Sequence, residues 1–203
     1  MQKNVISCKI YGIIIRVKKK GIRLKIYIVL TYTGTLLSRV IKTFKRSQFA
    51  HVSISLDEDL KEMYSFGRLN AYNAFIGGFV HESLSSGTFK RFQNTRALVL
   101  EVNVNETKYN KIRKIIEKFK KNKNAYRFNI IGLALTAVHI RFKQKNRFYC
   151  TEFVKYLLDE AKYKHDLPSF TEPDDFIGFN NGKVVYKGLL KNYDESETLA
   201  QGS

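Results

Sequence analysis

The sequence is short of several residue types, and each shortage excludes a class of protein. Only two cysteines, Cys8 and Cys150, occur among 203 residues, so there is neither a disulfide framework nor the paired spacing of a zinc site. Prolines also number two, and no Pro-, Gly- or Ser-rich run marks a linker. No stretch reaches the roughly 20 apolar residues that a membrane span requires. We therefore expect one globular domain over residues 1–195, a C-terminal tail at 196–203, and no metal or cofactor.

A secretion signal is missing as well. The apolar run at 10–17 precedes the basic residues Lys18 to Lys20, which is the reverse of the order in a signal peptide. Two cysteines are also compatible with a reducing compartment. These patterns predict a cytoplasmic protein, with peripheral attachment to a membrane left open.

Acidic residues are scarce in two long segments. None precedes Asp57, and Glu117 is the only one between residues 107 and 147, while the net charge of the whole chain is +18. Such a field attracts polyanions such as nucleic acid, anionic lipid headgroups or wall polymers, although a solvated basic surface is the simpler alternative. Aromatic residues do not alternate with the basic runs as they do in nucleic-acid modules. Specific binding of DNA or RNA is therefore not expected.

Hydrophobic periodicity predicts an α+β fold in which an antiparallel sheet packs on helices. We expect strands at 8–17, 22–30, 50–56, 62–67, 97–104 and 183–186, of which the first two would form a hairpin. Helices are expected at 36–45, 105–121, 128–140 and 150–164. The third of these helices is apolar nearly all round, which predicts burial at the centre of the fold. Asn, Gly and Ser residues at 68–95 predict a long ordered loop.

The stretch from Arg147 to Leu158 carries the strongest chemical signal. Apolar residues recur at helical spacing after Cys150, so this cysteine is predicted at or just before the first turn of a helix. Backbone N–H groups without intrahelical partners and the positive end of the helix dipole favour a thiolate there. A nucleophile also needs a base, and a lone cysteine is otherwise a small buried hydrophobe.

Of the four histidines, His51 is the best placed to act as that base. It opens a predicted strand on its polar face, and a strand gives a general base rigid support. His81 falls in the predicted long loop, His139 in the apolar helix and His165 at the end of the cysteine helix. Structural roles are expected for His139 and His165.

Two short motifs carry a family resemblance. Residues 47–54, Ser-Gln-Phe-Ala-His-Val-Ser-Ile, resemble the "Ser/Ala-His-Val-Gly/Ser-Ile" strand of the papain-like NlpC superfamily. Residues 148–154, Phe-Tyr-Cys-Thr-Glu-Phe-Val, resemble its "Tyr-Cys-Ser/Thr-Glu-hydrophobic-Val" helix start. The histidine precedes the cysteine, the reverse of papain. This order is similar to that of the circularly permuted branch, which includes YiiX/YaeF-type bacterial proteins and lecithin:retinol-acyltransferase-like enzymes.

The resemblance implies a papain-like core and a pair of catalytic residues. Cys150 would attack an acyl carbon as the thiolate, and His51 would accept its proton and later protonate the leaving group. In the family a third polar residue orients the histidine from the neighbouring strand. The closest correspondence is Ser65, and the alternatives are Glu82 and Glu62.

The predicted activity is that of a cysteine amidohydrolase or peptidase, a thiol hydrolase that cleaves an amide or ester bond. Bacterial cell-wall peptide is the leading substrate, and without export the enzyme would act on imported peptidoglycan fragments. A lipid-directed acyltransferase or hydrolase is the second possibility. It would need an apolar patch beside Cys150, for which the loop residues are Phe75, Ile76, Phe79 and Val80. A non-catalytic polyanion-binding module is the third possibility.

Overall fold

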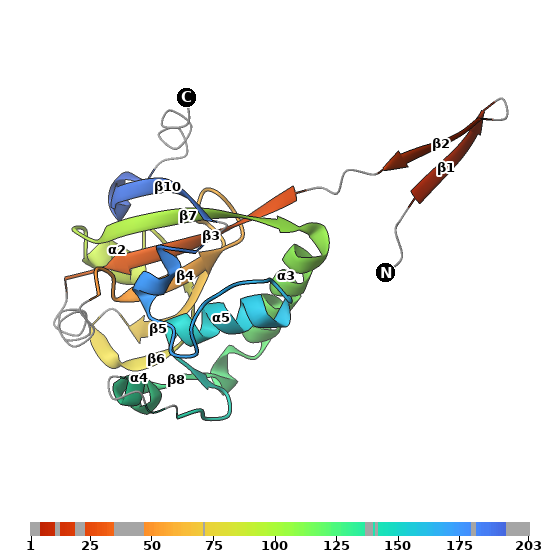
Figure 1. Cartoon of the computed structure of the whole chain (residues 1–203). Coiled ribbons are helices and arrows are strands. Elements are labelled where there is room, and N and C mark those ends of the chain that lie inside the picture. The colour runs from red at the N-terminus through yellow and green to blue at the C-terminus, as the bar shows by residue number, and fades with distance from the viewer. Residues whose placement is uncertain are drawn as a thin grey trace.

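A six-stranded antiparallel sheet forms the centre of the molecule, in the computed structural model shown in Figure 1. The structure describes residues 5–10, 13–18, 23–34, 47–70, 72–136, 140, 142–179 and 182–193. From one edge of the sheet to the other, the strands are β10 (Gly182–Leu189), β7 (Arg96–Asn105), β3 (Arg23–Tyr32), β4 (His51–Ser55), β5 (Met63–Asn70) and β6 (Asn73–Glu82). Together with the helices, this sheet makes the protein an α+β protein.

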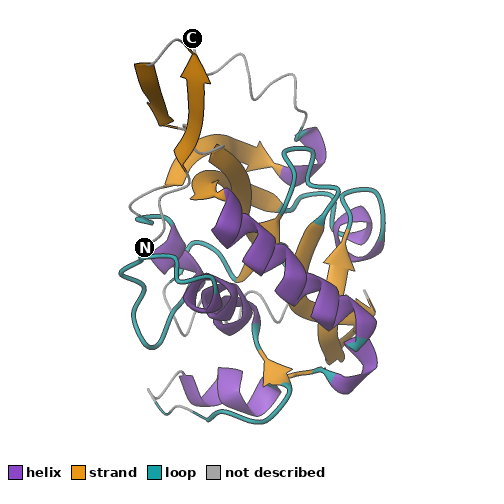
Figure 2. Cartoon of the chain, turned by 90° about the vertical axis from the view of Figure 1, so that its right-hand side faces the viewer, coloured by secondary structure: helices purple, strands orange, loops and turns teal. Residues whose placement is uncertain are grey.

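Helices cover the sheet unequally (Figure 2). The two longest helices of the described residues, α3 (Glu106–Lys121) and α5 (Cys150–Glu160), pack on one face. The short helix α2 (Gly87–Arg91) contributes to the core on the other. Around these lie α4 (Ile130–Thr136), the parallel pair β8 (Arg127–Phe128) and β9 (Arg147–Phe148), and the 3-10 turns η1 (Lys123–Ala125), η2 (Pro173–Phe176) and η3 (Leu190–Asn192).

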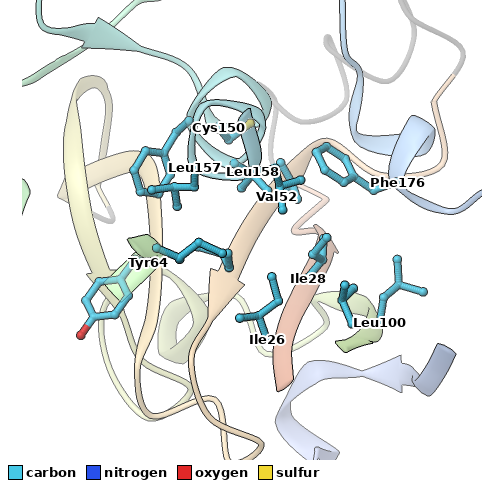
Figure 3. Packing of buried hydrophobic residues seen from close by; sticks show 14 of the residues in the cluster. Ile26, Ile28, Val52, Tyr64, Leu100, Cys150, Leu157, Leu158 and Phe176 are labelled. Carbon is cyan, nitrogen blue, oxygen red and sulfur yellow. The ribbon is translucent and has the colours of Figure 1, made fainter. Parts of the chain in front are cut away.

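Alternation along the strands builds the larger core beneath α5. Val52 and Ile54 of β4 point toward this helix, because successive side chains of a strand face opposite sides of a sheet. Leu157 and Leu158 meet them from α5, and Figure 3 shows these leucines above the sheet side chains with Cys150 on the same helix. The position of the cysteine is thereby fixed by close packing.

Several sequence predictions are confirmed. The strands expected at 50–56, 62–67, 97–104 and 183–186 correspond to β4, β5, β7 and β10. Asn105 caps α3 as the pattern indicated, since its Oδ1 accepts a hydrogen bond of 2.9 Å from the backbone N–H of Lys108. The cysteine helix begins as expected but ends at Glu160 instead of residue 164. Two residues later, Lys162 adopts a positive φ of 51°.

The expected hairpin between 8–17 and 22–30 is wrong. The first run contains two strands, β1 (Val5–Ile10) and β2 (Ile13–Lys18), which pair with each other in a separate two-stranded sheet. The second run belongs to β3, whose two edges are already occupied by β4 and β7. With both edges paired, β3 has no place for the earlier strand.

The predicted loop at 68–95 is also wrong, because it contains the end of β5, all of β6 and the helix α2. Gly77 and Gly78 are typical of a turn, but here they lie inside a strand. A Cβ atom on Gly77 would lie 2.7 Å from the Cβ of Phe128, so the glycine is required by the close approach of β8.

The expected buried helix at 128–140 is a third correction. Its described part is α4, Ile130–Thr136, and the first two side chains of this helix, Ile130 and Ile131, are 42% and 56% exposed. Continuous apolar sequence therefore does not mark burial here. The expected helix at 36–45, His139 and the tail at 196–203 lie outside the described residues.

Candidate active site

Cys150 is the first residue of α5 and is buried. Tyr149 precedes it with extended backbone angles, so the thiol sits where the first N–H groups of a helix have no intrahelical partner. Thr151 anchors this turn by donating a hydrogen bond of 2.7 Å from Oγ1 to the carbonyl of Thr171. The first turn is thus tied to the segment that precedes η2.

His51 is the first residue of β4. Alternation assigns its side chain to the face opposite Val52, whereas α5 packs on the Val52 face. The imidazole is nevertheless close enough to the thiol of Cys150 for the two groups to shift each other's pKa, since His51 lies at the end of β4 and this strand contacts α5. Its Nε2 lies 2.9 Å from Oε1 of Glu82, which leaves Nδ1 for the sulfur.

Glu82, the last residue of β6, is the polar centre of the cluster. Besides His51, its carboxylate accepts a hydrogen bond of 2.9 Å from Ser65 Oγ and another from Ser53 Oγ. Both serines are completely buried. Three adjacent strands therefore contribute side chains to one hydrogen-bonded network, in which the carboxylate holds the orientation of the histidine.

The environment of His51 and Glu82 keeps both groups charged. Burial lowers the pKa of His51, but the Glu82 carboxylate and the hydrogen bond to Cys150 raise it to about 10. Burial raises the pKa of the Glu82 carboxyl, whereas the charge and hydrogen bond of His51, with the serine hydroxyls, bring it below its ordinary value. At neutral pH the pair is an imidazolium beside a carboxylate.

The same charges act on the thiol. Burial raises the pKa of Cys150, but the hydrogen bond and positive charge of His51 outweigh burial and lower it overall. Backbone N–H groups of Val52 and Thr151 add two further hydrogen bonds to the sulfur. These influences favour the thiolate, which is the reactive form of cysteine.

Gly67 on β5 makes room for this arrangement. A Cβ atom placed there would lie 3.3 Å from Ser65 Oγ, 3.4 Å from His51 Cε1 and 3.5 Å from Glu82 Oε1. All three neighbours belong to the network. A glycine at this position therefore lets the imidazole and the carboxylate approach the strand closely.

The structure separates the three candidates for the orienting residue. Glu82 contacts His51 directly, while Ser65 contacts Glu82 and so lies one hydrogen bond further away. Glu62 precedes β5, where its backbone N–H donates to Asp57 Oδ1 at the far end of β4. It is not placed beside the histidine.

The sequence alone does not place Glu82 beside His51, because its pattern predicts a loop at 68–95. Once β6 is placed against β5, with Met63 opposite Glu82 and Ser65 opposite Val80, alternation puts Glu82 on the same face as Ser65. The local sequence carries little sign of this strand, since Gly77 and Gly78 interrupt its apolar residues and Phe79 and Val80 are adjacent.

The other histidines do not join this cluster where they are described. His81 is exposed and its ring bonds to the carbonyl of Lys61, and His165 bonds to Asp159 Oδ1. Among the described residues, no group of three or more His, Cys, Asp or Glu side chains is arranged to hold a metal ion. In the same part of the chain, no helix has the length and apolar character to cross a membrane.

The chain matches no protein-family model and no curated protein. The chemistry of the site therefore rests on its own geometry.

Proposed function

We propose that this protein is a cysteine hydrolase that cleaves an amide or ester acyl bond through Cys150 and His51. The observation that carries the proposal is the position of His51, which bonds to the largely buried Glu82 carboxylate and is electrostatically coupled to the Cys150 thiol. A nucleophile, a base and a residue that orients the base are the parts that covalent acyl transfer requires.

A papain-like core of the permuted NlpC type accompanies this proposal. A helix that begins with the cysteine packs on an antiparallel sheet that carries the histidine, and the histidine strand comes first in the chain. These features support the family resemblance of residues 47–54 and 148–154.

In the proposed reaction, the Cys150 thiolate attacks the acyl carbon and a tetrahedral oxyanion forms. Backbone N–H groups at the start of α5 are suited to stabilise that oxyanion. The His51 imidazolium then gives its proton to the departing nitrogen or oxygen, leaving a thioester. Next, His51 takes a proton from water, whose oxygen attacks the thioester and releases the acid. The thiolate and the imidazolium are restored at the end of the cycle.

Glu82 is proposed as a positioning residue. Its carboxylate fixes the tautomer and direction of the His51 ring and stabilises the imidazolium, as the third residue does in related nucleophilic sites. Ser53 and Ser65 hold this carboxylate ionised by donating to it. Their role is therefore exerted through Glu82 and not on the substrate.

A peptide or similar amide, such as a bacterial wall fragment, remains the leading substrate class. A lipid-like acyl substrate is the second candidate. It would need an exposed apolar patch, and Ile76, one of the residues expected to supply it, is 52% exposed. Phe79 is instead buried in the core and Val80 is half-buried, so neither provides exposed apolar surface. The non-catalytic polyanion-binding module is the remaining alternative.

The proposal is tested by the pH dependence of alkylation at Cys150, with Cys8 in the same chain as the reference thiol. Iodoacetamide labelling is mapped by peptide mass in the wild-type protein and in His51→Ala. We expect fast labelling of Cys150 well below pH 8, and a marked loss of rate in His51→Ala. Labelling that rises only near the pKa of a free thiol and ignores the histidine would contradict the proposal.

Acyl transfer itself is tested with p-nitrophenyl acetate. Wild-type protein should release one equivalent of nitrophenolate in a burst and carry an acetyl group on Cys150, whereas Cys150→Ala should show neither. Circular dichroism and thermal unfolding establish that Cys150→Ala retains the fold. An unchanged burst in this variant would exclude Cys150 as the nucleophile.

A further inference from the structure

Exposed apolar side chains gather around a groove at the β6 edge of the sheet. Residues from β5, β6, β8 and α4 line it, and β6 contacts β8 directly, as Figure 1 shows near α4. Leu69 is 53% exposed, Ile76 52% and Ile130 42%. Contiguous apolar surface of this kind on a water-soluble domain marks an interaction site.

α4 presents its apolar side chains outward on a rigid support. Asn129 is buried before the helix, where its Oδ1 accepts from the backbone N–H of Gly132 and its Nδ2 donates to the carbonyl of Phe142, both at 2.9 Å. The helix contains no charged residue, and Ile130 and Ile131 begin it at the surface. Their exposure is therefore set by a fixed backbone and not by a loose segment.

Positive charge surrounds this apolar surface. Arg127 and Arg147 line the groove itself. Along the sequence, no Asp or Glu occurs between Glu117 and Glu152, or between Glu62 and Glu82. Both walls of the groove therefore come from segments that carry cations and lack acids.

From this combination, we infer that the groove and α4 form a docking surface for an anionic lipid membrane. Apolar side chains enter the boundary between headgroups and acyl chains, while flanking Lys and Arg side chains bind anionic headgroups. Aliphatic Ile and Leu side chains beside Arg favour lipid over protein, because the centres of protein interfaces are enriched in Trp and Tyr. The inference does not depend on the proposed hydrolase activity.

The docking surface adjoins the segment that leads to the nucleophile. Arg147 lies in β9 and precedes Cys150 by three residues, a separation of at most about 10 Å along an extended chain. Docking would bring the membrane surface close to the start of α5.

Vesicle co-sedimentation of the full chain tests this inference. Vesicles of equal parts phosphatidylcholine and phosphatidylglycerol should bind wild-type protein, binding should weaken at high salt, and pure phosphatidylcholine should bind far less. The double variant Ile76→Asn/Ile131→Asn should reduce the partition coefficient roughly tenfold or more. Arg147→Gln should reduce it about fivefold.

Matched controls come from β10, at the opposite edge of the sheet. Val184 is 50% exposed and Lys187 is exposed, so Val184→Asn and Lys187→Gln remove the same kinds of group from another surface. Both controls should bind vesicles like the wild type, and so should Cys150→Ala. Equal losses in the β10 controls and in the groove variants would overturn the inference, as would absence of wild-type binding to anionic vesicles.

An alternative occupant of the groove is a second copy of this chain. Light scattering of the free protein measures whether it forms such a dimer. We expect the wild-type protein and the Ile76→Asn/Ile131→Asn variant to have the same molecular mass in solution. A wild-type dimer that this double variant converts to a monomer would overturn the membrane assignment.

Discussion

The two ends of the β5–β6 hairpin break the usual distribution of side chains in opposite ways. At one end, the polar Ser65 is fully buried, and the Glu82 side chain beside His51 is only 11% exposed. At the other end, Leu69 and Ile76 are apolar and lie at the surface. One pair of strands thus combines a buried hydrogen-bonded network with an exposed apolar groove, and both departures are expected at functional sites rather than in the supporting fold.

The two ends also differ in how their unusual side chains are stabilised. The buried polar groups satisfy one another, since Glu82 accepts from both serines and bonds to the imidazole. The exposed apolar groups have no such mutual compensation, and only a partner would remove them from water. Substitutions at the first end should therefore disturb chemistry and folding, whereas substitutions at the second should leave both intact.

The largest effect is expected from Glu82→Gln. Loss of the carboxylate charge should lower the pKa of His51 by roughly one to three units. The ring also loses the partner that fixes its orientation, so labelling of Cys150 at neutral pH should slow about tenfold or more. Iodoacetamide labelling rates at fixed pH measure this loss. Glu62→Gln, outside the network, is the control; equal rates in Glu82→Gln and wild type would contradict a positioning role.

A contrast between two isoleucines should sharpen the difference between buried and exposed apolar groups. Ile54→Ala removes a fully buried side chain and should lower the free energy of unfolding by about 2–5 kcal/mol. Ile131→Ala removes an exposed one and should change it by less than about 0.5 kcal/mol. Urea denaturation measures both values. A comparable loss in the two variants would mean that Ile131 is packed in solution.

The pH dependence of stability should reveal the buried ion pair. Because the pKa of Glu82 is lowered in the folded state, its contribution is present above about pH 4.3 and is lost as pH falls through the folded value. The pKa of His51 is raised to about 10, so its contribution is complete below about pH 6.5 and is lost as pH rises through about 10. Urea denaturation at a series of pH values measures the loss of stability on the acid side and on the alkaline side.

The lowered pKa of Cys150 acts in the opposite direction to His51. Its contribution is present above the unfolded thiol pKa of about 8.5 and is lost as pH falls through the folded value. Cys150→Ala removes this contribution together with the part of the His51 shift that the thiol causes, so the alkaline loss should move to lower pH. In Glu82→Gln, the loss of stability at acid pH should be smaller than in the wild type. An equal loss in the two proteins would mean that other carboxyl groups cause it.

A smaller effect is expected from Gly67→Ala. The added methyl group would lie 3.3–3.4 Å from Ser65 Oγ and His51 Cε1, close enough to displace the imidazole by a few tenths of an ångström. Labelling of Cys150 should slow several-fold, in keeping with the sensitivity of catalytic geometry to small shifts. The control is Gly78→Ala, opposite Gly67 in the strand register, whose added methyl would instead approach the carbonyl of Tyr126. It should not alter the labelling rate.

The smallest effect is expected from Ser65→Ala, which leaves Glu82 with its bonds to Ser53 and His51. Labelling should slow only a few-fold. Ser55→Ala is a close control, since this serine is equally buried but donates to Asp57 instead. It should lower stability without changing the labelling rate. If both variants slow labelling equally, the network is not specific to Glu82.

Local sequence determined most of the elements that carry the candidate site. Strict alternation from Val52 to Leu56 defined β4, and helical spacing after Cys150 defined α5, because these periods follow directly from strand and helix geometry. The helix-start position of the cysteine followed from the same pattern. The pairing of Cys150 with His51 as nucleophile and base came from the family resemblance and remains a proposal.

Only the tertiary structure decided which residue stands behind the histidine and which apolar residues stay in water. Glu82 reaches His51 because β6 pairs with β5, a contact between distant segments that no local period encodes. Ile130 and Ile131 are as apolar as any core residue, and their exposure depends on where the helix docks. Local patterns specify the faces of an element, whereas pairing and docking between elements decide what each face meets.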